Sequence, residues 1–423
     1  MIRRTGFQYT AVEEALRKLM VEVALKPSEE VIHFQDSFKR ILAKDIVSKV
    51  DIPLHDMSTL DGYSFRANDV SFARSKPVTL KVMGEGRLAE IPRYVLKVGE
   101  AFKILTGGIL PKGSDTVIGI EDVEHRKDII RISRSIDRRA GVYHKGEDVR
   151  NQQIVLKRGH QVRAQDIGLL AMIGVRSVCV VRKPRVAVMP VGSELTDNLD
   201  SIEIGKIPST HNLIILKLIE EAGGEPITFS VTQDDVHILK ARLTRALEEA
   251  DIVLTIGGTS LGEADLVEDA VDLLGKPGMI VHGVKLDPGR VAGFGVVMGK
   301  PVILLPGLIQ STINAFIVFG YPMIQLANGF VSGGGEYMVH ATLTKDREFR
   351  KRFLDFTKIT YVTLSNTGDS IKAEPITGET AMISVLTKAN GYILSPEDKK
   401  ELKAGDQVKV NLLPGFSFYS GQV

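Results

Sequence analysis

Residues 252–265, IVLTIGGTSLGEAD, constrain the fold more than any other stretch of this chain. The first five residues are apolar or β-branched, which is typical of a buried strand. Gly257 and Gly258 follow, and they permit backbone angles and close approaches that a Cβ atom forbids. A helix is predicted over residues 263–274. A strand, a glycine turn and a helix N-terminus favour an anion site, although a simple capping turn explains the same pattern equally well.

The alternation of elements around this stretch predicts the fold class. From residue 185 to residue 332, strand-like and helix-like runs alternate, which predicts an α/β domain with a doubly wound, mostly parallel sheet. Beyond the glycines at 333–335 the runs alternate like strands, which predicts a separate, small C-terminal β domain or barrel. Short strands and glycine turns over residues 76–122 predict a further β-rich module.

Composition excludes several classes of protein. The 423 residues include 54 Lys and Arg against 52 Asp and Glu, a balance that argues against a protein built to coat nucleic acid. The one cysteine, Cys179, excludes an internal disulfide and a cysteine-rich zinc site, and fits a reducing compartment. We find no signal peptide and no run of membrane-spanning length, so we expect a cytoplasmic protein with no membrane or nucleic-acid partner.

Polar residues follow the predicted parallel strands, at the edge where such sheets bind ligands. They are Ser193, Glu194, Asp234 and Asp235, with Pro306 and Gly307 after the strand VILLP. Carboxylates beside a turn that can bind an anion indicate a phosphate ligand bridged by a divalent cation. Without the cation, the negative carboxylates would repel the negative phosphate. Each acid taken alone could equally be a helix cap. The nine histidines show no zinc spacing, and Ser193 has no obvious base partner for a Ser-His-acid hydrolase.

Seven motifs, in order along the chain, resemble the MoeA/gephyrin E-domain family, the molybdopterin molybdenumtransferases. They are PLHDMSTLDGYSFR, ILTGGILPKGSDTVIGIED, KGEDVR, PRVAVMPVGSEL, GGTSLGEAD, DPGR and LPGLIQS. The resemblance implies an elongated protomer in four parts and a homodimer whose cleft lies between two subunits. The implied parts are a split N-terminal domain (1–50 and 153–184), an inserted β-rich domain (51–152), the α/β domain (185–332) and the C-terminal β-barrel (333–423).

The implied reaction inserts molybdate or tungstate into adenylylated molybdopterin and releases AMP with Mg²⁺. The resemblance implies catalytic roles for Asp61, Thr106, Asp148, Glu194 and Asp265. It assigns Asp234 and Asp265 to the metal. It implies ligand contacts from Gly257, Gly258, Ser260, Gly262, Ser193, Lys285, Pro306, Gly307, Lys358 and Thr380. The molybdopterin adenylyltransferase is the protein partner that the family implies, as the supplier of the substrate.

Several positions depart from the family pattern. Ser193 replaces an aspartate, Asp287 and Gly283 replace two lysines, and Leu308 with Ile309 replaces an Asn-Pro pair. Losing these two lysines and gaining the Asp287 carboxylate replaces attraction for an oxyanion with repulsion. Each contact between such a side chain and the oxyanion is worth about 1–3 kcal/mol. Two alternatives therefore stay open: a molybdopterin-binding carrier or scaffold with weakened catalysis, and an enzyme that cleaves another phosphoanhydride.

Overall fold

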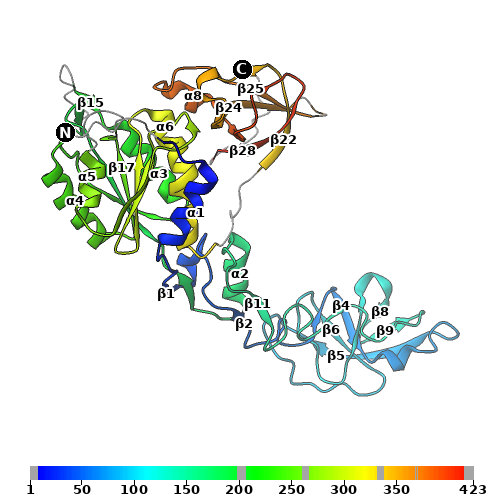
Figure 1. Ribbon diagram of the computed structural model, residues 1–423. Coiled ribbons are helices and arrows are strands. Elements are labelled where there is room, and N and C mark those ends of the chain that lie inside the picture. Colours follow the sequence, from blue (N-terminus) through cyan, green and yellow to red (C-terminus); the bar gives the residue numbers. More distant parts are fainter. Residues whose placement is uncertain are drawn as a thin grey trace. The chain divides into compact units, whose positions relative to one another are not determined.

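The computed structural model describes residues 8–197, 206–259, 266–330, 338–366, 368 and 370–413. The chain divides into two compact units (Figure 1). Unit 1 comprises Met1–Glu30 and Val181–Val423, and unit 2 comprises Val31–Val180. The four parts that the sequence predicts stay a prediction. Residues 1–30 belong to unit 1 and residues 31–50 to unit 2.

A six-stranded sheet forms the centre of unit 1. Its order is β16 (Glu225–Thr228), β13 (Arg185–Pro190), β17 (Ile252–Ile256), β21 (Lys300–Leu305), β20 (Gly293–Val297) and β18 (Pro277–His282). The first four strands are parallel, and β20 is antiparallel to both of its neighbours. This confirms the mostly parallel sheet. We did not predict β20, because its glycines interrupt a five-residue run.

Helices cover both faces of this sheet, as a doubly wound fold requires (Figure 1). Successive strand residues point to opposite faces. Thus Val186 and Ile252 share a core with the helices of one face, whereas Ala187 and Val253 pack with the helices of the other. The first face carries α1 (Val12–Glu22), α3 (Thr210–Glu221), α6 (Ile309–Ala315), the π-helical turn η4 (Phe316–Gly320) and α7 (Tyr321–Ala327). The second face carries α4 (Val236–Glu249) and α5 (Leu266–Asp272).

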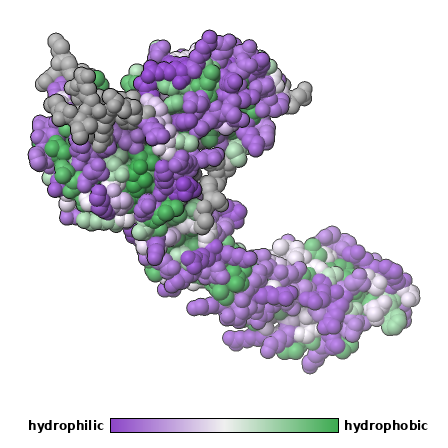
Figure 2. Space-filling view, in the orientation of Figure 1, coloured by the Kyte–Doolittle hydropathy of each residue, from purple (hydrophilic) through white to green (hydrophobic). Residues whose placement is uncertain are grey.

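The C-terminal strands close into a small barrel, as predicted. Their order is β24 (Thr357–Asn366), β25 (Ile371–Pro375), β22 (Met338–Leu343), β28 (Gln407–Leu412) and β26 (Gly391–Ser395), with β26 pairing back to β24. Closure removes the exposed strand edges. The short strand β19 (Leu286–Asp287) of the α/β part pairs with β24, and helix α8 (Ile383–Lys388) precedes β26. Hydrophilic residues cover most of the visible face of this barrel (Figure 2).

Unit 2 contains a second six-stranded sheet. Its order is β7 (Thr116–Gly119), β4 (Gly62–Phe65), β6 (Glu100–Ile104), β5 (Val78–Glu85), β9 (Ile129–Ile132) and β8 (Glu124–Arg126). Tyr63 and Phe65 are fully buried in its core. A separate core forms around Leu42, Val162 and helix α2 (Ala164–Met172).

Short elements complete the two units. They are β1 (Glu29–His33), β2 (Ile46–Val47), β3 (Met57–Ser58), β10 (Val142–Tyr143), β11 (Ile154–Leu156), β12 (Ser177–Val181), β14 (Leu195–Thr196), β15 (Ile207–Pro208), β23 (Arg347–Glu348) and β27 (Glu401–Leu402). Among the helices described above, none is long and apolar enough to cross a membrane.

Candidate functional site

The glycine turn after β17 lies at the carboxyl edge of the parallel strands. Gly257 and Gly258 have φ angles of 81° and 66°, which disfavour other residues. A Cβ atom on Gly257 would lie 2.5 Å from the carbonyl oxygen of Val191, the first residue after β13. The turn therefore needs glycine both for its backbone angles and for the close approach of β13. Three predicted ligand residues, Ser260, Gly262 and Asp265, lie outside the described residues.

Beside this turn, Ser193 holds the carboxylate of Asp234. The backbone N–H and the hydroxyl of Ser193 each donate to Oδ2 of Asp234, both at 3.0 Å. Lys206 Nζ in turn donates to the Ser193 carbonyl oxygen at 2.6 Å. Ser193 thus donates two hydrogen bonds to the Asp234 carboxylate. An aspartate at this position would instead place a second negative charge beside it. Glu194 is exposed nearby, and its carboxylate folds over Gly192.

The neighbouring residues Asp234 and Asp235 differ in their hydrogen bonds. Asp235 caps α4, because its Oδ1 accepts from the N–H groups of His237 at 2.9 Å and Ile238 at 3.0 Å. These bonds hold the pKa of Asp235 below its usual range. Asp234 caps no helix and is exposed at the sheet edge. The capping explanation therefore applies to Asp235 and not to Asp234.

The donor chemistry of Asp234 fits Mg²⁺. A carboxylate is the ligand that Mg²⁺ prefers, and the ion commonly takes one or two of them together with phosphate oxygens and water. Within the described residues, Oδ1 of Asp234 accepts no hydrogen bond. Over the same residues no group of three or more His, Cys, Asp or Glu side chains gathers as a metal site. A single exposed carboxylate is the kind of ligand that Mg²⁺ takes together with phosphate oxygens and water.

The loop after β21 lies next to the glycine turn. A Cβ atom on Gly307 would lie 3.8 Å from Cα of Gly257. The carbonyl oxygen of buried Pro306 accepts the Thr312 hydroxyl at 2.6 Å, which fixes the start of α6. The backbone N–H of Gln310 donates to the Thr380 carbonyl oxygen at 3.2 Å, so Thr380 of the barrel part lies at the N-terminus of α6.

The two lysines predicted to bind ligand are both engaged elsewhere. Lys285 Nζ forms an ion pair with Asp355 at 3.1 Å. Lys358 is buried, and its ammonium donates to the carbonyl oxygens of Leu354 at 2.6 Å, Lys399 at 2.8 Å and Glu397 at 3.4 Å. These bonds occupy all three donors of an ammonium group. Burial lowers the pKa of Lys358, against the opposing effect of nearby carboxylates that include Asp287. Lys358 thus has a structural place in the barrel.

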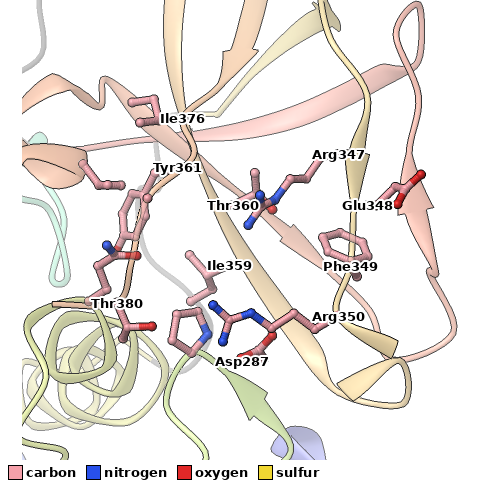
Figure 3. Close-up of a pocket in the computed structure, with 14 residues that line it drawn as sticks. Asp287, Arg347, Glu348, Phe349, Arg350, Ile359, Thr360, Tyr361, Ile376 and Thr380 are labelled. Carbon is pink, nitrogen blue, oxygen red and sulfur yellow. The ribbon is translucent and has the colours of Figure 1, made fainter. Parts of the chain in front are cut away.

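A pocket opens between the α/β part and the barrel, and Figure 3 shows its lining. It is lined by Asp287, Pro288, Gln310, Arg347, Glu348, Phe349, Arg350, Ile359, Thr360, Tyr361, Ile376, Gly378, Thr380 and Val385. Sequence reasoning included Thr380 and Asp287 but missed Arg347 and Arg350. The basic run REFRKR over residues 347–352 was the available signal.

In unit 2, hydrogen bonds join the loops that carry Asp61, Thr106 and Asp148. The N–H of Thr106 donates to Oδ1 of Asp61 at 2.7 Å, and this bond is the main cause of a lowered Asp61 pKa. Gly107 donates to the Ser58 carbonyl oxygen at 2.8 Å, which joins the first two loops. The third loop joins through β10, whose Val142 pairs with Ser58.

Asp148 belongs to this third loop and is exposed. Its backbone N–H donates to the Ile52 carbonyl oxygen at 3.1 Å. Nearby, the N–H of Lys145 donates to Oδ1 of Asp56 at 2.8 Å, which ties the loop to the segment before Ser58. Unit 2 therefore presents Asp61, Thr106 and Asp148 from loops that are bonded to one another.

The fold and these loops define a multidomain α/β protein whose parallel sheet carries a glycine turn at its carboxyl edge. Three family models match the chain: MoeA N-terminal region (domain I and II) over residues 10–174, a probable molybdopterin binding domain over 187–326, and MoeA C-terminal region (domain IV) over 340–413. A crystal structure of the molybdopterin biosynthesis MoeA protein from Pyrococcus horikoshii is 32% identical with a TM-score of 0.84, covering 97% of this chain and 100% of that one. The chain belongs to the MoeA family.

Two curated relatives are similar to this chain along most of its length. A protein of Staphylococcus aureus named molybdopterin molybdenumtransferase is 28% identical over 95% of both chains. Molybdopterin molybdenumtransferase 2 of Mycobacterium tuberculosis is 29% identical over 88% of this chain and 91% of its own.

Proposed function

We propose that this protein is a molybdopterin molybdenumtransferase of molybdenum cofactor biosynthesis. It inserts molybdate or tungstate into adenylylated molybdopterin and releases AMP in a Mg²⁺-dependent step. Membership of the MoeA family and the names of the curated relatives support the reaction class. The geometric observation that carries the proposal is Asp234, held by Ser193 beside the Gly257–Gly258 turn.

The proposed roles follow from the chemistry of each group. The N–H of Gly258 and N–H groups of the Gly307 loop would donate to phosphate oxygens, and Asp234 with Asp265 would hold Mg²⁺. The N–H of Gly257 instead donates to the Leu305 carbonyl oxygen at 3.0 Å. The ion, when bound, neutralises phosphate charge. Ser193 orients Asp234, and Ser260 with Gly262 would complete the turn around the ligand. Glu194, exposed at the same edge, would receive or supply a proton.

We further propose a homodimer in which Asp61, Thr106 and Asp148 of one subunit serve the ligand edge of the other. The bonded arrangement of the unit 2 loops supports a joint role for these residues. The molybdopterin adenylyltransferase is the proposed supplier of the substrate. Sedimentation of the purified protein tests the dimer, and a monomer at micromolar concentration would contradict it.

A second candidate is a carrier or scaffold that binds the pterin nucleotide with weak catalysis. Asp287 in place of a lysine, and the pairing of Lys285 with Asp355, favour it. The two are separated by mixing the protein with adenylylated molybdopterin, Mg²⁺ and molybdate or tungstate, and measuring AMP. The transferase predicts metal-dependent AMP release. Ligand that stays bound and intact would instead establish the carrier.

A further inference from the structure

One arginine of unit 2 has a backbone conformation that is rare for its type. Arg139 lies in the loop before β10 and has a φ angle of 75°, which glycine adopts far more readily than arginine. Its backbone N–H donates to the Asp115 carbonyl oxygen at 2.9 Å and to the Thr116 hydroxyl at 3.2 Å. Strained residues of this kind persist where their surroundings hold them, and they are concentrated at functional sites.

His144 holds the side chain of Arg139. Nε of Arg139 donates to Nε2 of His144 at 3.0 Å. Because Nε2 accepts this bond, the ring proton lies on Nδ1, which is 3.6 Å from Oδ1 of Asp56. The His144 N–H donates to Oε2 of Glu147 at 2.7 Å, which fixes the histidine backbone. Over the described parts of the chain, the terminal nitrogens Nη1 and Nη2 of Arg139 donate to no group.

Hydrogen bonds join the Arg139 loop to the loops proposed for catalysis. The N–H of Thr59, two residues before Asp61, donates at 3.0 Å to the carbonyl oxygen of Gly141, two residues after Arg139. The chain then runs through β10 to the corner that carries Asp148. Arg139 therefore belongs to the same set of bonded loops as Asp61 and Asp148.

Arg139 is one of three Lys or Arg side chains in this part of the chain, and the other two are paired. Nε of Arg138 lies 3.0 Å from Oδ2 of Asp115, and Nζ of Lys145 lies 3.5 Å from Oδ2 of Asp51. No carboxylate of the described residues pairs with Arg139. The acids of these loops repel an anionic substrate unless a cation offsets them. Arg139 is the unpaired cation that can do so.

We propose that Arg139 is a further substrate-binding residue, whose terminal N–H groups bind a phosphate of adenylylated molybdopterin. The parallel N–H donors of a guanidinium group match two oxygens of a phosphate. His144 is a positioning residue, because its bond to Nε directs the terminal edge of the guanidinium toward the ligand. This inference rests on the proposed transferase function and on the proposed homodimer, in which unit 2 of one subunit serves the ligand edge of the other.

Equilibrium dialysis of the full chain with adenylylated molybdopterin tests Arg139 apart from turnover. Mg²⁺ is present and the oxyanion is left out, so that the ligand stays intact. Arg139→Met should raise the Kd by about five- to tenfold, because an exposed charged hydrogen bond is lost. Arg138→Met is the matched control, since Arg138 is a neighbouring exposed arginine that is already paired with Asp115. Its Kd should stay within about twofold of the wild-type value.

Arg139→Gly separates binding from folding. Glycine adopts a φ of 75° without strain, so the melting temperature of this variant should not fall. Its Kd should nevertheless rise as much as that of Arg139→Met. A purely structural role of Arg139 predicts the opposite, a lower melting temperature with an unchanged Kd.

Two variants of His144 test its positioning role. His144→Gln keeps an oxygen that can accept from Nε of Arg139, and its Kd should stay within about twofold of wild type. His144→Leu removes the acceptor and should raise the Kd by about threefold. In the Arg139→Met background His144→Leu should have no further effect, because the side chain that it positions is gone.

Several outcomes would overturn the inference. They are a wild-type protein that does not bind the ligand, Arg139 variants that bind as wild type does, or a His144→Leu effect that persists without Arg139. Failure of the proposed function is separate. It appears as bound ligand that releases no AMP when molybdate or tungstate is added, while the Kd still depends on Arg139.

Discussion

Ser193 donates two hydrogen bonds to one oxygen of Asp234, from its backbone N–H and from its hydroxyl, each 3.0 Å long. This pair lies where β13 and β16 end, and it fixes the orientation of the carboxylate at the proposed ligand edge. Only one of the two bonds uses the Ser193 side chain. Replacing Ser193 should therefore reduce activity less than replacing Asp234.

Replacing Asp234 should therefore be far more harmful than replacing Ser193. Asp234→Ala removes the proposed Mg²⁺ ligand, so we expect AMP release to fall by about 100-fold or more. Ser193→Ala keeps the backbone bond and should raise the Mg²⁺ concentration for half-maximal rate by only about two- to fivefold. Mg²⁺ titrations of the two variants measure both effects. Equal losses in both variants would mean that Ser193 does more than orient Asp234.

Substitution at the glycine turn should cost stability. Gly257→Ala forces an L-residue to a φ of 81° and places its Cβ atom 2.5 Å from the Val191 carbonyl oxygen. We expect a loss of about 2–4 kcal/mol in the free energy of unfolding of unit 1. Gly405→Ala is the control, because Gly405 has a φ of 92° with open space around it. Urea unfolding that gives equal losses for both variants would exclude the close approach as a cause.

Much of the α/β fold of unit 1 could be predicted from the sequence, because short runs of neighbouring residues mark its strands and turns. The run from Ile252 to Ile256 shows the apolar pattern of a strand buried on both faces, and the glycines after it mark the turn. The pocket was not predictable in the same way. Asp287 and Arg350 meet only because β19 pairs with β24 and closes the α/β part onto the barrel. The three carbonyl partners of Lys358 likewise depend on barrel closure, which no local pattern encodes.

In unit 2, the charge of Asp61 should matter more than its hydrogen bond. Asp61→Asn keeps an oxygen that accepts the Thr106 N–H and so preserves the turn, while it removes the charge. We expect a normal melting temperature and a fall of about tenfold or more in AMP release. Asp69→Asn is the matched control, since Oδ2 of Asp69 accepts the Gly99 N–H at 2.9 Å in the same unit. Full activity in the Asp61 variant would remove this residue from the proposed site.

Asp166 should make the stability of unit 2 depend on acid pH. Burial alone would raise the pKa of this carboxyl, but hydrogen bonds from Arg163 and His160 outweigh burial and hold the pKa well below its usual range. A depressed pKa stabilises the folded state above the unfolded-state value of about 4, and that stabilisation fades as the pH falls below it.

Asp166→Asn tests this dependence. We expect it to lower the free energy of unfolding of unit 2 by about 1–3 kcal/mol at pH 7, with the difference from wild type narrowing below about pH 4. Asp69→Asn, in the same unit, serves again as the control. A difference that stays constant from pH 7 to pH 3 would contradict the role given to the Asp166 charge.

The proposed transferase couples phosphoanhydride cleavage to metal insertion. The most direct measurement is a single turnover with protein in excess over adenylylated molybdopterin, in which AMP and pterin-bound molybdenum or tungsten are quantified in the same sample. The account predicts one AMP released for each metal atom inserted, with both absent when Mg²⁺ or the oxyanion is omitted. AMP released without inserted metal, or at the same rate without oxyanion, would contradict it.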